Sequence, residues 1–256
     1  MKTILISLSL MFTSVIMAQN VIEITYLDIP ANKISRFLEL HKTITDMSID
    51  DQRTLKGHWV YRHWYGSGAS VVIFDQYDSA VDAINDDFNA AYMKAYEKLS
   101  DDQKKEADAN FAEWWSFFKG HWDEIRRVDY QNYYVSKENL DWDIPYVFVV
   151  GSYNTTEKLG EVANAYMDWQ IRPNVNNKTQ LMGAASSHYK GSGSDLQFYA
   201  AFANIVDFAQ TVSTQGSDNT EARTKFWNAV SGAHEDQIYR HIGHISNGKF
   251  DFAGKE

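Results

Sequence analysis

The residues with the clearest chemical potential lie in two similar blocks of the sequence. The first block is His63-Trp64-Tyr65-Gly66-Ser67-Gly68, and His188-Tyr189-Lys190-Gly191-Ser192-Gly193 follows 125 positions later. A neutral imidazole can act as a general base, hydrogen-bond a polar ligand or bind a metal. His63 and His188 are therefore the candidate catalytic residues. The alternative is a pair of strand histidines that make only local hydrogen bonds.

Side chains near these blocks predict a ligand site. Such sites combine apolar or aromatic walls with a few polar groups. Two arginines recur at matched positions, and a pair of guanidinium groups could hold a substrate carboxylate through paired hydrogen bonds. The alternative for the arginines is surface pairing with the many Asp and Glu residues. The predicted ligand-binding residues are Trp64, Phe74, Tyr189, Gln197, Tyr199, Arg127 and Arg240.

Several chemistries are excluded by what the sequence does not contain. It has no cysteine, so thiol catalysis, iron–sulfur clusters and thiolate zinc sites are impossible. It also has no His-Glu-x-x-His, phosphate-binding loop, Gly-x-Gly-x-x-Gly or Gly-x-Ser-x-Gly. His241 and His244 are three residues apart in an expected strand, which would place them on opposite faces. We therefore predict no metal site and no bound cofactor.

The matched blocks belong to a longer internal similarity. The same offset aligns the apolar face of one expected helix with another, with His41 falling on Tyr166. Further along, the offset drops to about 112 and aligns Trp115 with Trp227, both predicted as core. The first copy therefore contains about 13 extra residues, placed between 89 and 110, where Ser100 to Gln103 predicts a helix start. The internal similarity predicts a duplicated chain.

The two copies differ at positions that matter for function. Arg62 aligns with Ser187, Tyr65 aligns with Lys190, and Asp75 aligns with Ala200. Such divergence fits one working site beside one degenerate half, and it fits equally a scaffold without a site. The expected order in each copy is strand, helix, strand, hairpin, strand, helix, strand. This βαββαβ order is the ferredoxin-like arrangement and predicts an α+β fold.

Strand alternation predicts which side chains face inward. Val71 and Ile73 should lie under the helices, while Val72 and Phe74 should face the space between the two sheets. The facing of His63 depends on the hairpin. A two-residue turn pairs His63 with position 70 on the cavity face, and a three-residue turn pairs it with position 71 on the helix face.

In element order, hairpins and duplication, residues 21–245 resemble the dimeric α/β barrel superfamily, including its antibiotic-biosynthesis monooxygenase and stress-responsive branches. The resemblance implies that two sheets, usually from two chains, enclose a shared interior. Here residues 19–139 and 140–256 would be two tandem ferredoxin-like units pairing as an intramolecular pseudo-dimer. It also implies cofactor-independent oxygenation of aromatic substrates, isomerisation or haem handling. The Asn, Trp and His set of the haem-degrading branch has no match in either copy.

The N-terminus predicts export. Lys2 precedes an apolar run from Ile4 to Ile16, and Ala18 offers a cleavage point, so residues 1–18 read as a signal peptide. The mature chain would be periplasmic or secreted, with no membrane association after cleavage. The formal charge of −10 argues against nucleic-acid partners.

The combined prediction is an exported barrel that binds a small aromatic or apolar molecule, as a monooxygenase-like enzyme. The alternative is a non-catalytic ligand carrier or an envelope interaction module. An open interior containing His63 or His188 favours the enzyme. A closed apolar interior without buried polar groups favours the alternative.

Overall fold

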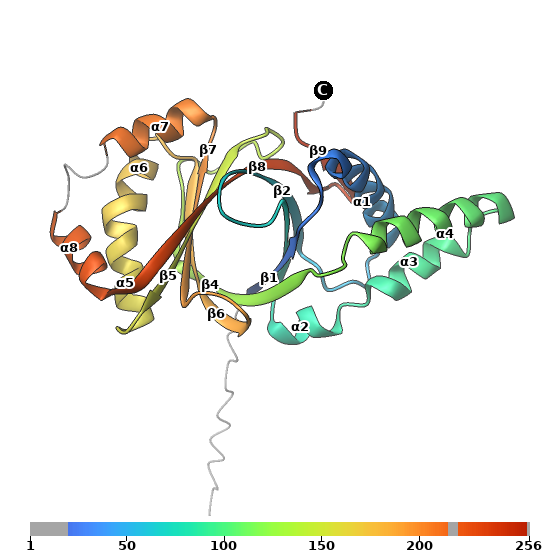
Figure 1. Ribbon diagram of the computed structural model, residues 1–256, viewed down its shortest axis with the longest axis horizontal. Coiled ribbons are helices and arrows are strands. Elements are labelled where there is room, and N and C mark those ends of the chain that lie inside the picture. The colour runs from blue at the N-terminus through green and yellow to red at the C-terminus, as the bar shows by residue number, and fades with distance from the viewer. Residues whose placement is uncertain (1–19, 215–219, 255–256) are drawn as a thin grey trace, which may run out of the picture.

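Eight antiparallel strands close into a barrel with helices on its outside (Figure 1). The computed structural model describes residues 20–214 and 220–254. The strands follow the order β2-β3-β1-β4-β6-β7-β5-β8, and pairing between β2 and β8 closes the ring. The predicted signal peptide lies outside the described residues. None of the described helices is long and apolar enough to cross a bilayer.

The first half of the barrel spans residues 21–135. Its strands are β1 (Val21–Leu27), β2 (Gly57–Gly66), β3 (Val71–Tyr77) and β4 (Trp122–Val135). A short 3₁₀ turn (Ala31–Lys33) leads into helix α1 (Ile34–Ser48), and the helices α2 (Ala80–Asn85), α3 (Phe88–Tyr96) and α4 (Asp101–Ser116) separate β3 from β4.

The second half spans residues 147–252. Its strands are β5 (Val147–Thr155), β6 (Met182–Gly191), β7 (Leu196–Phe202), β8 (Val230–Ser246) and β9 (Lys249–Phe252). Its helices are α5 (Leu159–Tyr166), a π-helical turn (Met167–Ile171), α6 (Arg172–Asn176), α7 (Ile205–Thr214) and α8 (Thr220–Ala229). Each half contributes four barrel strands in the same local order, β2-β3-β1-β4 and β6-β7-β5-β8.

The alternation of side chains along the strands divides the core into three clusters. Val72 and Phe74 point into the barrel, whereas Val71 and Ile73 pack under the first-half helices, as the sequence predicts. The third cluster packs the outer face of the second half against its helices. The prediction of Trp115 and Trp227 as core was wrong: Trp115 is 57% exposed and Trp227 is 39% exposed, whereas their chain neighbours Trp114 and Phe226 are buried.

Three helices separate β3 from β4, and the last of them begins where the sequence predicts a helix start. Helix α4 begins with a capping box, in which Ser100 accepts a hydrogen bond from the backbone N–H of Gln103 and the Gln103 side chain bonds back to residue 100. Strand β9 extends the sheet beside β8 and was not predicted. Its Phe250 is buried against α1, where the backbone N–H of Phe250 donates to Asp46 at 2.6 Å. The last strand of the second half, β9, therefore packs against helix α1 of the first half.

The two Gly-Ser-Gly hairpins need glycine because they lie against a neighbouring backbone. Gly66 has φ +90° and Gly191 has φ +94°. A Cβ atom at Gly66 would lie 2.4 Å from the Asp236 carbonyl oxygen, and one at Gly191 would lie 2.4 Å from that of Asp123. Both the backbone angle and the space exclude a larger residue.

Candidate active site

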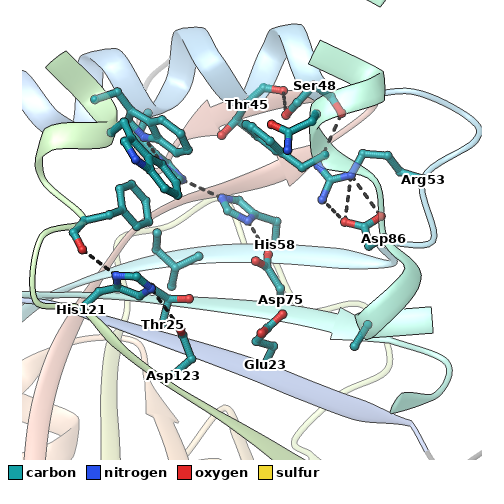
Figure 2. A pocket seen from close by; sticks show the side chains of 18 of the residues that line it. Glu23, Thr25, Thr45, Ser48, Arg53, His58, Asp75, Asp86, His121 and Asp123 are labelled. Atoms are coloured by element: carbon teal, nitrogen blue, oxygen red, sulfur yellow. Dashed lines mark hydrogen bonds and ion pairs between the residues drawn. The ribbon is translucent and has the colours of Figure 1, made fainter. Parts of the chain in front are cut away.

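A cavity of about 490 Å³ lies between the outer face of the first-half strands and the helices that cover them (Figure 2). We call it the sheet–helix cavity. Alternate strand residues form its floor, and helices α1 and α4 form its roof. Its lining includes Glu23, Thr25, His41, Thr45, His58, Ile73, Asp75, Asp86, Phe88, Phe111, Trp114, Trp115, Phe118, His121 and Asp123.

A directed chain of hydrogen bonds runs along the floor and roof of this cavity. The indole N–H of Trp114 can only donate, so it donates to Nδ1 of His41 at 3.1 Å. His41 must then hold its proton on Nε2 and donate it to Nε2 of His58 at 2.9 Å. His58 in turn holds its proton on Nδ1 and donates to Oδ1 of Asp75 at 2.6 Å. Each donor and acceptor in the chain is therefore fixed.

Burial affects the histidine on the helix side of this chain most. His41 and His58 are both buried. Burial, followed by the neighbouring His58, holds the pKa of His41 well below its ordinary value, so His41 stays neutral. The chain delivers a hydrogen bond from the helix layer to Asp75 and fixes that carboxylate in position.

Glu23 is the group in the cavity best suited to move a proton. It lies opposite Asp75 in the β1–β3 register, so the two carboxyl groups share one face of the sheet. Burial and then the charges of Asp75, Asp123 and Asp86 raise the pKa of Glu23 from 4.5 to about 7. A general base works best when its pKa is close to the working pH. Glu23 can therefore accept or donate a proton near neutrality.

Hydrogen-bonded side-chain pairs lie at both ends of the cavity. At one end, Arg53 pairs with Asp86, which also accepts from the backbone N–H of Thr54 at 3.0 Å. At the other end, Nε2 of His121 lies 3.1 Å from Asp123. Because Arg53 is already committed to Asp86, the open carboxylates of the cavity leave its interior negative. No group of three or more His, Asp or Glu side chains within the described ranges is placed to hold a metal ion.

The matching space in the second half is packed with rings. Tyr166 takes the place of His41 and stacks on Phe198 with ring centroids 3.9 Å apart, and Phe226 lies 5.0 Å from Tyr166. Gly183 takes the place of His58, and the space a Cβ would need there is filled by Ile171. Of these two matched layers between strands and helices, only the first-half layer contains the polar hydrogen-bond chain.

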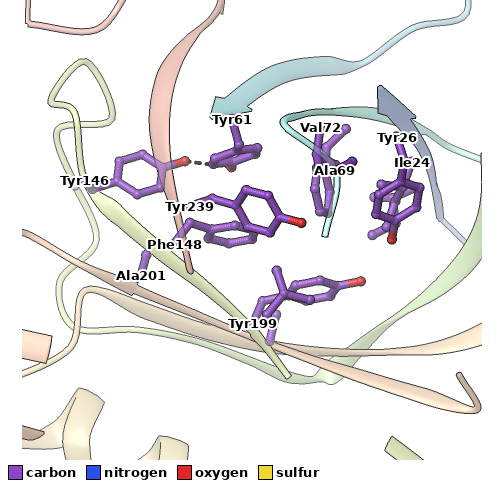
Figure 3. Close-up of a cluster of buried hydrophobic side chains, with 14 residues drawn as sticks. Ile24, Tyr26, Tyr61, Ala69, Val72, Tyr146, Phe148, Tyr199, Ala201 and Tyr239 are labelled. Carbon is purple, nitrogen blue, oxygen red and sulfur yellow. Dashed lines mark hydrogen bonds between the residues drawn. The ribbon is translucent and has the colours of Figure 1, made fainter. Parts of the chain in front are cut away.

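The barrel interior contains a second hollow, of about 330 Å³, lined mostly by aromatic rings. Figure 3 shows the buried side chains of the interior, among which Tyr61, Phe148 and Tyr199 line the hollow. Phe74 and Tyr199, both predicted ligand residues, line it. Gln197 also faces inward, as predicted, and donates to Glu124 at 3.0 Å. That carboxylate pairs with the buried guanidinium of Arg126 at 2.7 Å. The interior therefore has an aromatic end and a polar end.

The two predicted catalytic histidines face inward but line neither hollow. The backbone N–H of His63 donates to the Ser70 carbonyl at 3.0 Å, which is the pairing expected for a two-residue turn. Nε2 of His63 is buried and has no hydrogen-bond partner within the described residues. Nε2 of His188 is 3.2 Å from the Gly191 carbonyl, the local contact given above as the alternative. Their catalytic role stays a prediction.

Four predicted ligand residues lie outside the barrel and cannot line its interior. Trp64 and Tyr189 follow the inward histidines by one residue, so alternation turns them outward, and both are exposed. Arg127 and Arg240 are also exposed. The Arg127 guanidinium lies 4.2 Å from the centroid of the Tyr189 ring, as a surface cation–π pair. Their inward-facing neighbours, Arg126 and Tyr239, occupy the places predicted for the arginines.

The prediction for His241 and His244 was also wrong. The register against β2 shifts between Val60 and Tyr61, which adds one residue to β8. This bulge brings the two rings to the same side, with centroids 5.3 Å apart. His244 pairs with Asp143 at 3.3 Å, and Nδ1 of His241 donates to the Ile144 carbonyl at 3.0 Å.

The residues of the sheet–helix cavity were missed as a site, although two signals pointed to them. The internal alignment sets His41 against Tyr166 and Asp75 against Ala200. At both positions the first half has a polar side chain, whereas the packed second half has a larger or an apolar one. Had these differences been read together, they would have located the polar layer.

Comparison with known proteins supports the fold. No protein-family model and no curated protein matches the chain. An anthrone oxidase-like protein matches with a TM-score of 0.60 at 12% identity, over 93% of this chain and 97% of that one. A presumed monooxygenase from Fusobacterium nucleatum gives 0.60 at 9% identity, over 93% and 99%. Another from Lactobacillus acidophilus gives 0.55 at 8%, over 92% and 97%. The chain therefore has the ferredoxin-like α/β-barrel fold of these monooxygenase-like proteins.

Proposed function

We propose that this protein is a monooxygenase-like enzyme that activates an aromatic substrate by proton abstraction in the sheet–helix cavity. The observation that carries the proposal is Glu23, a carboxyl with a pKa of about 7 beside the Asp75 end of the hydrogen-bond chain. A base with this pKa can remove an activated proton near neutral pH. The chain holds Asp75 in place, and the Asp75 charge helps to keep the pKa of Glu23 high.

The walls of the cavity suit a flat substrate. Phe88, Phe111, Trp115 and Phe118 line it together with the carboxylates. Rings on the wall bind rings of a ligand by stacking and edge contacts. Because the carboxylates leave the interior negative, a substrate without its own carboxylate is favoured. A neutral polycyclic ketone or phenol fits these conditions.

The proposed reaction is oxidation of an activated CH₂ group by molecular oxygen. Glu23 takes a proton from the carbon, and the resulting carbanion is oxidised by O₂, so that CH₂ becomes C=O and one molecule of water is released. For anthrone, a substrate class suggested by the name of one structural neighbour, the product is the anthraquinone.

Two further features belong to this proposal. The matched strand orders, hairpins and aligned residues support a duplicated chain whose units, 19–139 and 140–256, pair as an intramolecular pseudo-dimer. The apolar run behind Lys2 supports export and a periplasmic or secreted location. The partner is a small aromatic molecule, without nucleic acid and without membrane association after cleavage.

Oxygen uptake with anthrone tests the proposal. We expect the wild-type protein to consume O₂ and form quinone faster than a protein-free control at pH 7. Glu23→Gln should lower kcat by about 100-fold or more, the usual contribution of a general base. Asp75→Asn should retain activity with the pH–rate profile moved to lower pH, because a charge that raises the pKa of Glu23 is removed.

The matched control is Glu157→Gln, an exposed glutamate of the second half, which should leave the rate unchanged. The proposal is wrong if Glu23→Gln oxidises anthrone and related hydroxylated polycyclic compounds as fast as wild type. It is equally wrong if wild type does not exceed the protein-free rate with any of them.

A further inference from the structure

The hollow inside the barrel is separate from the proposed reaction site and has a different chemistry. We propose that it is a second binding site, for an uncharged planar aromatic molecule of two or three rings. Its walls come from both halves of the barrel, namely Trp59, Tyr61, Phe74, Phe148 and Tyr199. We call it the barrel cavity.

The rings of the barrel cavity are held in fixed mutual orientations. Tyr61 stacks on Phe148 with centroids 4.5 Å apart and planes 16° from parallel. Phe148 is parallel to Tyr199 within 5° at 5.8 Å, and Phe74 meets Phe148 edge-on at 5.6 Å. Stacked and edge-to-face rings form a rigid apolar surface with the spacing that another aromatic ring also prefers. The wall is thus organised before a ligand arrives.

The electrostatics of the barrel cavity select an uncharged ligand. Among the described residues that line it there is no Asp, Glu, Lys, Arg or His. The hydroxyl groups of Tyr61 and Tyr146 bond to each other at 2.8 Å, and the Tyr199 hydroxyl donates to Gln197 at 2.9 Å. Burial raises the pKa of Tyr199 to about 12, so this wall stays neutral at physiological pH. A charged ligand would lose its hydration without gaining a partner.

The volume fits a molecule larger than benzene. An apolar protein cavity of about 150 Å³ holds one benzene, and the barrel cavity is about 330 Å³. Protein interiors usually contain few voids larger than a water molecule. A ring-lined hollow of this size, open to solvent where the exposed Tyr130 and Tyr133 line it, is therefore better explained as a place for a ligand than as imperfect packing.

The two cavities lie back to back across the first-half strands. On β3, Phe74 lines the barrel cavity, whereas its neighbours Ile73 and Asp75 line the sheet–helix cavity. Because side chains alternate along the strand, successive residues of β3 line opposite cavities, one apolar and one polar. Changes at one site can therefore be made without altering side chains at the other. The hydroxyls of Tyr61, Tyr146 and Tyr199 are already hydrogen-bonded within the protein, which fits binding without reaction.

The test uses the neutral fluorescent probe N-phenyl-1-naphthylamine. We expect saturable binding to wild type, with energy transfer from Trp59 and Trp142, which line the barrel cavity. Ala184→Phe puts a ring into the cavity and should weaken binding at least tenfold. Ala184→Leu, a milder filling, should weaken it at least threefold and serves if the first variant does not fold by circular dichroism.

Two variants of the other cavity are the controls. Glu23→Gln and Trp115→Ala should retain the binding component that Ala184→Phe removes, whether or not the protein oxidises anthrone, and any probe binding that they lose belongs to the sheet–helix cavity. The proposal is overturned if wild type does not bind the probe. It is also overturned if the folded Ala184 variants bind the probe as tightly as wild type. It is overturned too if Glu23→Gln and Trp115→Ala, rather than the Ala184 variants, lose probe binding.

Discussion

The substitution Glu23→Gln should make the protein more stable in alkaline solution while removing the proposed base. Glu23 is held in the sheet–helix cavity with Asp75, Asp123 and Asp86 nearby, and His41, His58, His121 and Arg53 also line that space. The folded protein raises the pKa of Glu23 from 4.5 to about 7. Glutamine has nearly the same shape and carries no charge at any pH.

The sign and size of the effect follow from proton linkage. Below pH 4.5 the carboxyl is protonated in both the folded and the unfolded chain, and it contributes no difference. As the pH rises from 4.5 to about 7, the unfolded chain loses this proton first, so wild type loses stability across this window. The full shift from 4.5 to about 7 corresponds to at most about 3 kcal/mol. Because the carboxyl is partly open to solvent, we expect roughly 1–2 kcal/mol.

Urea unfolding of both proteins at pH 3.5 and pH 8 measures this difference. At pH 8, Glu23→Gln should have the larger free energy of unfolding by roughly 1–2 kcal/mol, and at pH 3.5, where the carboxyl is protonated in both states, the two proteins should agree. Groups that do not interact with Glu23 titrate equally in both proteins and cancel. The reasoning fails if the difference is the same at both pH values, or if the variant is the less stable protein at pH 8. Glu157→Gln should show no difference at either pH.

Three further outcomes follow from the barrel interior and its hairpins. Arg126→Met leaves the Glu124 carboxylate buried without its cation and should lower the free energy of unfolding by about 3–5 kcal/mol in urea titrations; a loss below about 1 kcal/mol would contradict the buried pair. Tyr146→Phe removes the 2.8 Å hydroxyl pair and should cost about 1 kcal/mol in the same assay. Gly191→Ala should lower the thermal midpoint of unfolding, because residue 191 has φ +94° and the new Cβ would lie 2.4 Å from a carbonyl oxygen. The same change at Gly160, where no atom obstructs a Cβ, should not lower the midpoint.

Features with a short sequence period were predictable from the sequence. Alternation assigned Val71 and Ile73 to the helix side and Phe74 to the barrel side, because strand side chains alternate in a fixed way. The capping signal at Ser100 located the start of α4, because a hydroxyl and a side chain three residues later satisfy the first free N–H groups of a helix. Such local rules need no knowledge of the rest of the chain.

Errors arose wherever a choice between adjacent residues depended on tertiary contacts. Trp115 was chosen over Trp114, and Arg127 over Arg126, because matching the two copies does not say which neighbour points inward. The bulge in β8 cannot be seen from spacing alone, since one extra residue reverses the faces of all that follow. The strand register and the helix rotation that settle these choices are set by packing of the whole barrel.

The hydrogen-bond chain lay further beyond prediction. Trp114, His41, His58 and Asp75 come from one helix of the insertion, another helix and two strands. Their contacts span up to 73 positions along the sequence. The alignment differences mark His41 and Asp75, but nothing in the sequence joins Trp114 and His58 to them, and the chain forms only when the sheet and the helix layer meet.

The unequal halves make physical sense as parts of one closed barrel. Open carboxylates and a buried polar chain reduce the stability of the layer that contains them, since charges lose hydration there. The second half fills the matching layer with Tyr166, Phe198 and Phe226 and so gains apolar burial. The closing pairs β2–β8 and β4–β6, with Phe250 seated on α1, join the two halves into one unit. The packed half can therefore offset the cost of the polar half, which is a condition for keeping a reactive carboxyl at Glu23.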